Sequence, residues 1–130
     1  MKVGLVGWRG MVGSVLIERM QAEGDFAHIE PTFFTTSQAG EVAPQFGQTQ
    51  TTLIDASNLD ALMEMEAILT CQGGGYTESI HPQLRAAGWR GYWIDAASTL
   101  RMADEATIIL DPVNQPVIDQ ALHEGKKDFI

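Results

Sequence analysis

The fold of this chain is decided by residues 3–13, which read VGLVGWRGMVG. Residues 3–7 are apolar or glycine and predict a short first strand. Helical spacing follows over residues 11–23, and Gly24 is placed to end that helix. The loop between strand and helix carries three glycines at a spacing of three: Gly7, Gly10 and Gly13. A strand that enters a helix through such a loop opens a βαβ unit.

Strands and helices alternate along the rest of the chain. The predicted strands are residues 29–35, 67–71, 92–95, 107–111 and 127–130, and the predicted helices are residues 57–65, 76–87 and 117–124. The central strands are continuous apolar runs, which indicates that both faces of the sheet are buried. We therefore expect a Rossmann-like, doubly wound α/β sheet, mostly parallel and flanked by helices, in one domain that spans residues 1–130.

Two details of the helices follow from local pattern. Ser57 is a good N-cap for the helix predicted at residues 57–65. In the first helix, the spacing of the large apolar side chains places four of them on one face: Met11, Val15, Leu16 and Met20. This arrangement makes the first helix amphipathic.

Composition limits what the chain can do. Its 130 residues are 45% hydrophobic, which is enough for one compact domain but not for two. The net charge of −9 makes nucleic acid and anionic membrane surfaces poor partners. No apolar run approaches the roughly 20 residues that span a bilayer, and the first residues are interpreted as a strand and not as a signal peptide. Cys71 is the single cysteine, so no internal disulfide can form and a cytoplasmic location is expected.

The glycine loop has the chemistry of a pyrophosphate site. Glycine permits positive φ and close backbone approach, and the free N–H groups in the first turn of a helix attract phosphate. We therefore expect the loop to bind a dinucleotide, although a plain βα turn with small packing residues would show the same glycines. Valine at Gly10 is expected to block the pyrophosphate and to resist the dihedral angles of the turn.

The end of the second strand indicates which dinucleotide binds. An NAD site usually places Asp or Glu here, about 20 residues beyond the glycines, to hold the ribose hydroxyls. This chain has Thr35, Thr36 and Ser37 instead. Hydroxyl and loop N–H groups can donate to a 2′-phosphate, and Arg9 on the facing loop can add positive charge, so the pattern favours NADP. An ordinary loop cap is the alternative for the same residues.

The third strand ends in Cys71, which precedes Gln72 and a run of glycines that starts at Gly73. Cys71 is interpreted as a buried strand cysteine, because spacing pairs no histidine with it. Gln72 and Gly73 lie at the carboxyl edge of the sheet, where a cofactor would approach. Arg101 also follows a strand end, and spacing leaves open whether it binds an anion or is a solvated surface residue. The three histidines lack ligand spacing, so no metal site is expected.

Several long strings together resemble the aspartate-semialdehyde dehydrogenase family, in the form typical of Gram-negative bacteria. They are residues 6–16, VGWRGMVGSVL; 33–37, FFTTS; 70–74, TCQGG; 88–98, GWRGYWIDAAS; 100–102, LRM; and 109–114, ILDPVN. The resemblance runs along almost the whole chain, and GWRGMVG is far more specific than a bare glycine pattern.

The resemblance implies an activity and a set of site residues. Members of this family reduce L-aspartyl 4-phosphate to L-aspartate 4-semialdehyde with NADPH and release phosphate, which feeds lysine, diaminopimelate, threonine and methionine synthesis. They are typically homodimers. The residues that would contact NADP are Arg9, Gly10, Met11, Val12, Gly13, Thr36, Ser37 and Gln72, and loop chemistry adds Gly7 and Gly73. Arg101 would bind the phosphate of the substrate.

The chain departs from the family pattern at two places. Gly75 stands where the family usually has Asp. The family's nucleophilic cysteine lies in a Gly-Asn-Cys segment that would begin beyond Ile130, so we expect the NADP-binding part of a longer enzyme, with no catalytic residue and no turnover of its own. The alternatives are a stand-alone NADP-binding sensor or regulatory module, and an N-acetyl-glutamyl-phosphate reductase. The string GWRGMV argues against the second.

Overall fold

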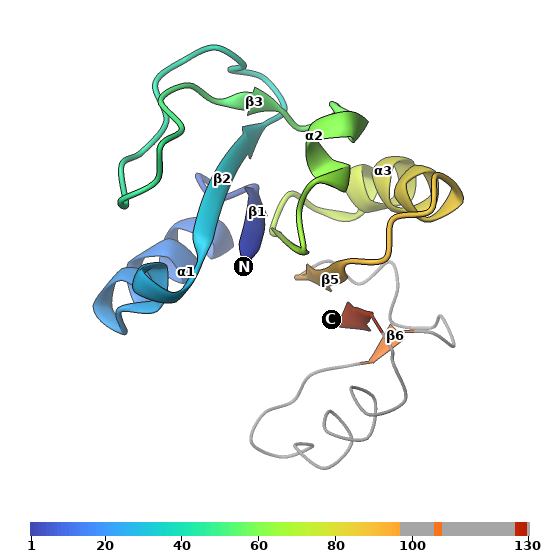
Figure 1. The fold of residues 1–130 in the computed structure, drawn as a ribbon. Coiled ribbons are helices and arrows are strands. Elements are labelled where there is room, and N and C mark those ends of the chain that lie inside the picture. Colours follow the sequence, from blue (N-terminus) through green and yellow to red (C-terminus); the bar gives the residue numbers. More distant parts are fainter. Residues whose placement is uncertain (97–105, 108–126, 130) are drawn as a thin grey trace.

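The computed structural model of the chain describes residues 1–96, 106–107 and 127–129 (Figure 1). Within these residues, seven strands form one sheet in which all neighbouring strands are parallel: β1 Lys2–Val6, β2 Glu30–Thr35, β3 Ile54–Asp55, β4 Ala67–Thr70, β5 Tyr92–Asp95, β6 Ala106–Thr107 and β7 Asp128–Phe129. The helices are α1 Met11–Ala22, α2 Leu59–Met63 and α3 Gly74–Ala86, with a 3-10 turn at Asp25–His28. The predicted doubly wound parallel sheet is confirmed.

The order of the strands places a ligand crevice near the middle of the sheet. The order is β3-β2-β1-β4-β5-β7-β6, so β1 pairs with β2 on one side and with β4 on the other. The chain first builds outward from β1 through β2 to β3 and then crosses back to β4. In open α/β sheets, ligands bind outside the carboxyl ends of the strands at this reversal.

Helices cover the two faces of the sheet unequally. On the face that we call the α3 face, Phe34 and Trp93 of the sheet pack against Leu62 of α2 and Leu84 of α3 in one buried cluster. On the opposite face, the α1 face, Phe33 is buried in a second cluster. Figure 1 shows α1 on the other side of β1 and β2 from α2 and α3. Successive strand residues point to opposite faces, which explains why Phe33 and Phe34 belong to different clusters.

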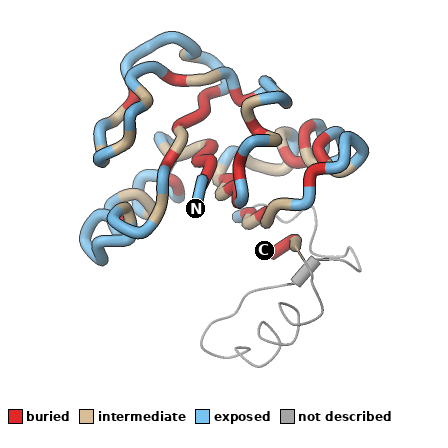
Figure 2. Tube along the Cα trace, viewed as in Figure 1, coloured by how far each residue is buried: buried red, intermediate tan, exposed pale blue. Residues whose placement is uncertain are grey.

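The orientation of α1 differs from the predicted one. Met11 is 88% exposed and Val15 is 54% exposed, and only Met20 of the predicted face is buried. Figure 2 shows the helix as mostly exposed. Gly13, which is buried, faces the sheet instead, and Ile17 and Met20 lie on the same side one and two turns further on. The close approach at Gly13 sets the rotation of the helix and turns Met11 and Val15 outward.

The start of α2 also differs from the sequence prediction. The N-cap is Asn58, whose side-chain oxygen accepts a hydrogen bond from the N–H of Ala61 at 3.1 Å. Ser57 instead donates its hydroxyl to Asp55 at 2.7 Å, within the turn that follows β3. Both residue types favour N-caps, so local pattern could not separate two adjacent candidates. The two-residue β3 was not predicted at all.

β7 is confirmed where a strand was predicted, and it inserts between β5 and β6. It pairs with β5 through Trp93 and Ile94 and with β6 through Ala106 and Thr107. β6 begins one residue before the predicted strand at 107–111. The rest of that strand and the helix predicted at 117–124 lie outside the described residues.

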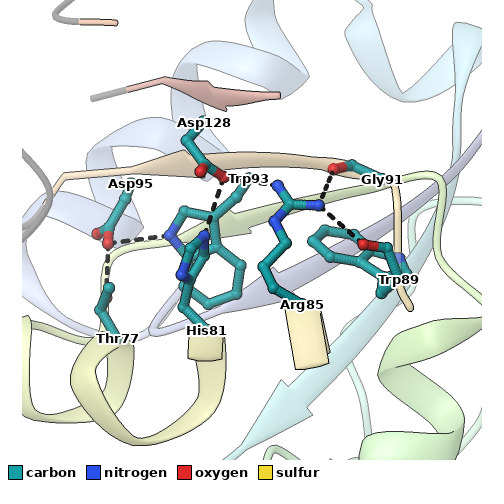
Figure 3. Close-up of polar contacts among 8 residues, drawn as sticks. All are labelled: Thr77, His81, Arg85, Trp89, Gly91, Trp93, Asp95 and Asp128. Carbon is teal, nitrogen blue, oxygen red and sulfur yellow. Dashed lines mark hydrogen bonds and ion pairs between the residues drawn. The ribbon is translucent and has the colours of Figure 1, made fainter. Parts of the chain in front are cut away.

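Asp128 links β7 to α3 through polar contacts with two side chains of that helix (Figure 3). Its Oδ1 accepts a hydrogen bond from Nη2 of Arg85 at 2.6 Å and lies 3.0 Å from Nε2 of His81. Arg85 also donates through Nη1 to the carbonyl groups of Trp89 and Gly91, both at 3.0 Å. Burial opposes ionisation of Asp128, but the hydrogen bonds and charges of His81 and Arg85 prevail and hold the pKa of Asp128 below its ordinary value. The carboxylate is therefore ionised and paired at neutral pH.

A second buried carboxylate, Asp95, joins the end of β5 to α3 (Figure 3). Its Oδ2 accepts hydrogen bonds from the hydroxyl of Thr77 at 2.5 Å and from the indole N–H of Trp93 at 3.1 Å. The ring of Trp93 is fully buried and lies against the rings of Tyr76 and Trp89. Polar and apolar contacts therefore both hold α3 on the sheet.

Candidate functional site

A pocket of about 420 Å³ lies at the carboxyl ends of β1, β2 and β4, beside the reversal in strand order. Three loops, one after each strand, supply its lining. The lining residues are Gly7, Trp8, Arg9, Gly10, Phe34, Thr35, Thr36, Ser37, Gln38, Cys71 and Gln72. The structure thus brings together a set of residues that the sequence analysis singled out from three separate segments: Gly7, Arg9, Gly10, Thr36, Ser37 and Gln72.

The backbone of the loop after β1 packs directly against the backbone of the loop after β4 and of the first turn of α1. Gly7 has a φ of 72°, and a Cβ built there would lie 2.4 Å from the backbone nitrogen of Gln72. A Cβ built on Gly13 would lie 2.0 Å from the carbonyl oxygen of Gly7. Real Cβ atoms do not approach other atoms so closely, so both positions require glycine unless the backbone moves. These two contacts place the start of α1 directly against the strand ends.

Gly10 differs from Gly7 and Gly13. From the sequence, the dihedral angles of the turn were expected to resist a larger residue at Gly10, and this expectation is wrong. Gly10 is the N-cap of α1 with φ −72° and ψ 179°, a conformation that any residue adopts. A Cβ there would meet the carbonyl oxygen of Gly7 at 3.7 Å, an ordinary contact. The dihedral angles therefore do not demand glycine. That a larger side chain at Gly10 would compete with a pyrophosphate stays a prediction, which its position in the pocket lining supports.

The first turn of α1 has backbone donors without a side-chain cap. Gly10 offers no capping side chain, and the first turn contains no acidic residue. The first N–H groups of a helix lack partners inside the helix, so they are available to an anion. Four predicted contacts do not line the pocket itself: Met11, Val12, Gly13 and Gly73. Gly13 acts through its close packing, and Met11 and Val12 belong to the first turn.

The end of β2 presents hydroxyl groups and no carboxylate. The hydroxyl oxygen of Thr35 accepts hydrogen bonds from the N–H groups of Ser37 at 3.3 Å and Gln38 at 3.2 Å. These two N–H groups therefore donate hydrogen bonds within the turn. From the sequence, loop N–H groups had been expected to donate to a phosphate. Thr36 and Ser37 are exposed and line the pocket, so their hydroxyls can donate to a ligand. Arg9 is the one charged residue among the described residues of the lining.

A loop of this shape at the reversal of a doubly wound sheet is the site where such folds bind dinucleotides. A family model described as semialdehyde dehydrogenase, NAD binding domain, matches residues 2–121. The chain belongs to this family.

Solved structures extend the comparison of this semialdehyde dehydrogenase domain. It is similar to aspartate semialdehyde dehydrogenase from Francisella tularensis, with 55% identity and a TM-score of 0.94 over 100% of this chain and 36% of that chain. Aspartate semialdehyde dehydrogenase II from Vibrio cholerae, complexed with ASA, has 19% identity and a TM-score of 0.74 over 98% of this chain and 37% of that chain. The enzyme from Candida albicans with NADP has 16% identity and a TM-score of 0.63 over 99% of this chain and 41% of that chain. The last two likenesses show the fold alone, and the chain spans only about a third of the length of the Francisella protein.

Sequence reasoning missed four lining residues of this semialdehyde dehydrogenase domain: Trp8, Phe34, Gln38 and Cys71. The position of Trp8 inside the glycine loop was a usable signal. Phe34 and Thr35 are the last residues of β2, so the pocket begins earlier on that strand than the loop pattern indicates. Cys71 follows β4 and is half-buried, not fully buried as expected.

The thiol of Cys71 is poorly suited to nucleophilic chemistry in this semialdehyde dehydrogenase domain. Burial, with a smaller effect from the charge of Asp95, raises the pKa of the Cys71 thiol above its ordinary value. The thiolate is the reactive form, so a raised pKa lowers reactivity at neutral pH. The interpretation of Cys71 as a structural cysteine is therefore supported by its surroundings.

Two other predicted positions lie outside this pocket or outside the described residues. Arg101, the predicted phosphate-binding residue, lies outside the residues that the structure describes. A Cβ at Gly75 would meet nothing within 4 Å, so the Asp that the family usually carries there could begin without steric conflict.

In the described part of the chain, no cluster of His, Cys, Asp and Glu could hold a metal ion. None of the helices described is long and apolar enough to cross a membrane.

Proposed function

We propose that the chain is the NADP-binding part of an aspartate-semialdehyde dehydrogenase. The whole enzyme would reduce L-aspartyl 4-phosphate to L-aspartate 4-semialdehyde with NADPH and release phosphate. The observation that carries the cofactor assignment is the end of β2, where Thr36 and Ser37 line the same pocket as Arg9 and the described lining contains no carboxylate. The 55% identity to the Francisella enzyme over the whole of this chain supports the assignment of the reaction.

Each loop of the pocket has a distinct role in this proposal. Bound NADPH supplies the hydride. The close packing at Gly7 and Gly13 brings the uncapped first turn of α1 to the pyrophosphate. The hydroxyls of Thr36 and Ser37 and the guanidinium group of Arg9 hold the 2′-phosphate, which a carboxylate at the same place would repel. Gln72, in the third loop of the pocket, would contact the cofactor, as the family resemblance implies.

The substrate, assembly and location of the whole enzyme are also proposals. The 55% identity to the Francisella tularensis aspartate semialdehyde dehydrogenase supports aspartate semialdehyde as the product. The family resemblance supports Arg101 as the phosphate-binding residue, a homodimer, and a role in the synthesis of lysine, threonine and methionine. The single cysteine supports a cytoplasmic location. The 130-residue chain is expected to show no turnover of semialdehyde, phosphate and NADP, because its single cysteine has a raised pKa. Turnover that disappears in Cys71→Ser would contradict this expectation.

Calorimetric titration with NADP and with NAD tests the cofactor assignment. We expect NADP to bind more tightly. Ser37→Asp should weaken NADP by about 2 kcal/mol, roughly thirtyfold in affinity, because it removes a hydrogen bond to the phosphate and adds a repelling charge. Ser79→Asp adds the same charge at an exposed position of α3 outside the pocket and serves as the matched control. Equal affinities of the unchanged chain for the two nucleotides would refute the proposal.

A further inference from the structure

Trp8 is a large side chain of the pocket to which the proposed function gives no role. It lies directly after Gly7 and is half-buried, so part of its ring faces the pocket. Its indole Nε1 donates a hydrogen bond to the carbonyl oxygen of Phe34 at 3.0 Å. That bond joins the loop after β1 to the end of β2, two segments that are 26 positions apart in the sequence.

The ring of Trp8 is fixed by a second contact. It meets the ring of Phe33 edge to face, with centroids 5.3 Å apart and an interplanar angle of 77°. Phe33 is fully buried and belongs to the rigid part of β2. A ring held by both a hydrogen bond and an aromatic contact has little freedom to rotate. Trp8 is therefore a fixed surface at the wall of the pocket.

Arg9 lies on this surface. Its Cζ is 4.7 Å from the centroid of the Trp8 ring, which is the geometry of a cation–π contact. Within the described part of the chain, no carboxylate forms an ion pair with Arg9, so none of these residues neutralises its charge. An exposed Arg has many rotamers, and holding it in one of them costs entropy unless a neighbour restrains it. Trp8 supplies that restraint.

We propose that Trp8 determines cofactor specificity by positioning Arg9 for the 2′-phosphate of NADP. The inference rests on the proposed function, because it takes the 2′-phosphate to lie between Arg9 and the hydroxyls of Thr36 and Ser37. Trp8 is a positioning residue: the hydrogen bond to Phe34 ties its ring to the strand that carries those hydroxyls. Trp8 thus contacts both the guanidinium group of Arg9 and the strand that leads to the hydroxyl groups.

The test compares two ligands that differ by one phosphate group, adenosine 2′,5′-bisphosphate and adenosine 5′-monophosphate. Calorimetry on the full 130-residue chain gives the ratio of their affinities, which measures recognition of the 2′-phosphate alone. We expect Trp8→Leu to lower this ratio about fivefold, in line with the strength of cation–π contacts. Trp8→Phe keeps an aromatic surface but loses the Nε1 hydrogen bond. Its affinity ratio should lie between that of the unchanged chain and that of Trp8→Leu. Circular dichroism checks that each variant is folded.

A second variant shows whether Trp8 acts through Arg9. Arg9→Leu should lower the ratio by about tenfold or more, because it removes a charge-assisted contact. In the Arg9→Leu background, Trp8→Leu should change the ratio no further. Independent, additive losses would overturn the inference, as would a Trp8→Leu ratio equal to that of the unchanged chain. Equal weakening of both ligands by Trp8→Leu would overturn it too, since Trp8 would then contact the adenine or merely support the loop.

The design separates this inference from the proposed function. If the unchanged chain fails to prefer the bisphosphate, the proposed function and the inference both fail. If the unchanged chain prefers it and Arg9→Leu removes that preference while Trp8→Leu does not, the cofactor assignment stands and the role of Trp8 is refuted.

Discussion

The α3 face and the α1 face of the sheet differ in how they hold their helices. On the α3 face, Trp93 and Leu84 are fully buried and two buried carboxylates add polar contacts. On the α1 face, Met11 and Val15 of the helix point away from the sheet, and the helix is positioned by the backbone approach at Gly13. Buried side chains hold α3 on one face, whereas on the other face the start of α1 is held by backbone contact, and Ile17 and Met20 further along the helix turn toward the sheet. The difference teaches that the helix end beside the pocket is positioned through backbone contact, and α3 through its side chains.

The strongest test of this comparison is Trp93→Ala. Trp93 is 0% exposed, contacts the rings of Tyr76, His81 and Trp89, and donates to Asp95. Its truncation leaves a large cavity and should lower the free energy of unfolding by about 3–5 kcal/mol. Chemical denaturation followed by circular dichroism measures the loss. A loss of less than about 1 kcal/mol would mean that the α3 face is not the main source of stability.

Gly13→Ala tests the claim that backbone approach positions α1. The new methyl group would lie 2.0 Å from the carbonyl oxygen of Gly7, so the helix must move away from the loop. We expect a loss of about 1–3 kcal/mol in unfolding free energy together with loss of nucleotide binding. Gly10→Ala is the matched control, because its methyl group would make only a contact of 3.7 Å. Similar losses in the two variants would contradict the assignment of the steric requirement to Gly13.

Asp128→Asn tests the polar part of the α3 face through its pH dependence. The pKa of Asp128 is lowered in the folded chain, so its stabilisation is fully present above the ordinary unfolded pKa near 3.8 and is lost as the pH falls through the lower folded value. The variant should be less stable by about 1–3 kcal/mol at neutral pH, and the difference from the unchanged chain should shrink in acid. Unfolding measured at a series of pH values checks this. Glu18→Gln, at an exposed carboxylate of α1, should show no comparable loss.

Val15→Ala is expected to have the smallest effect. Val15 is exposed on the outer side of α1, and alanine has the higher helix propensity, so the free energy of unfolding should change by no more than about 0.5 kcal/mol. The same thermal or chemical unfolding experiment measures it. A loss as large as that of a buried valine would show that the outer side of α1 packs against something in solution, and the contrast between the two faces would weaken.

Structural features were predictable from the sequence where they depend on one short segment of the chain. The glycine spacing after β1 and the hydroxyl residues after β2 located part of the pocket lining, because the strand-to-helix turn and the strand end are local features. The parallel sheet was likewise predicted from continuous apolar runs. These features do not depend on which distant residues become neighbours.

Features that depend on distant neighbours were not predictable. The rotation of α1 is set by contact between Gly13 and Gly7, so the apolar spacing of Met11 and Val15 pointed to the wrong face. The hydrogen bond of Trp8 to Phe34 joins the loop after β1 to the end of β2 and leaves no local pattern. The hydrogen bond from the Ser37 N–H to the Thr35 hydroxyl is, by contrast, a local contact over two positions, and it was not considered in the prediction from sequence.

The position of β7 has a consequence for how the chain folds during its synthesis. β7 comes last among the described strands, yet it lies inside the sheet between β5 and β6. While the ribosome is still extending the chain, β5 has left it long before Asp128, and its outer edge carries unpaired N–H and C=O groups. Closing that edge joins residues that are far apart in sequence, which is a slow step in folding. The nascent chain is therefore most prone to aggregate just before β7 emerges, and a pause in translation at that point would prolong the exposure.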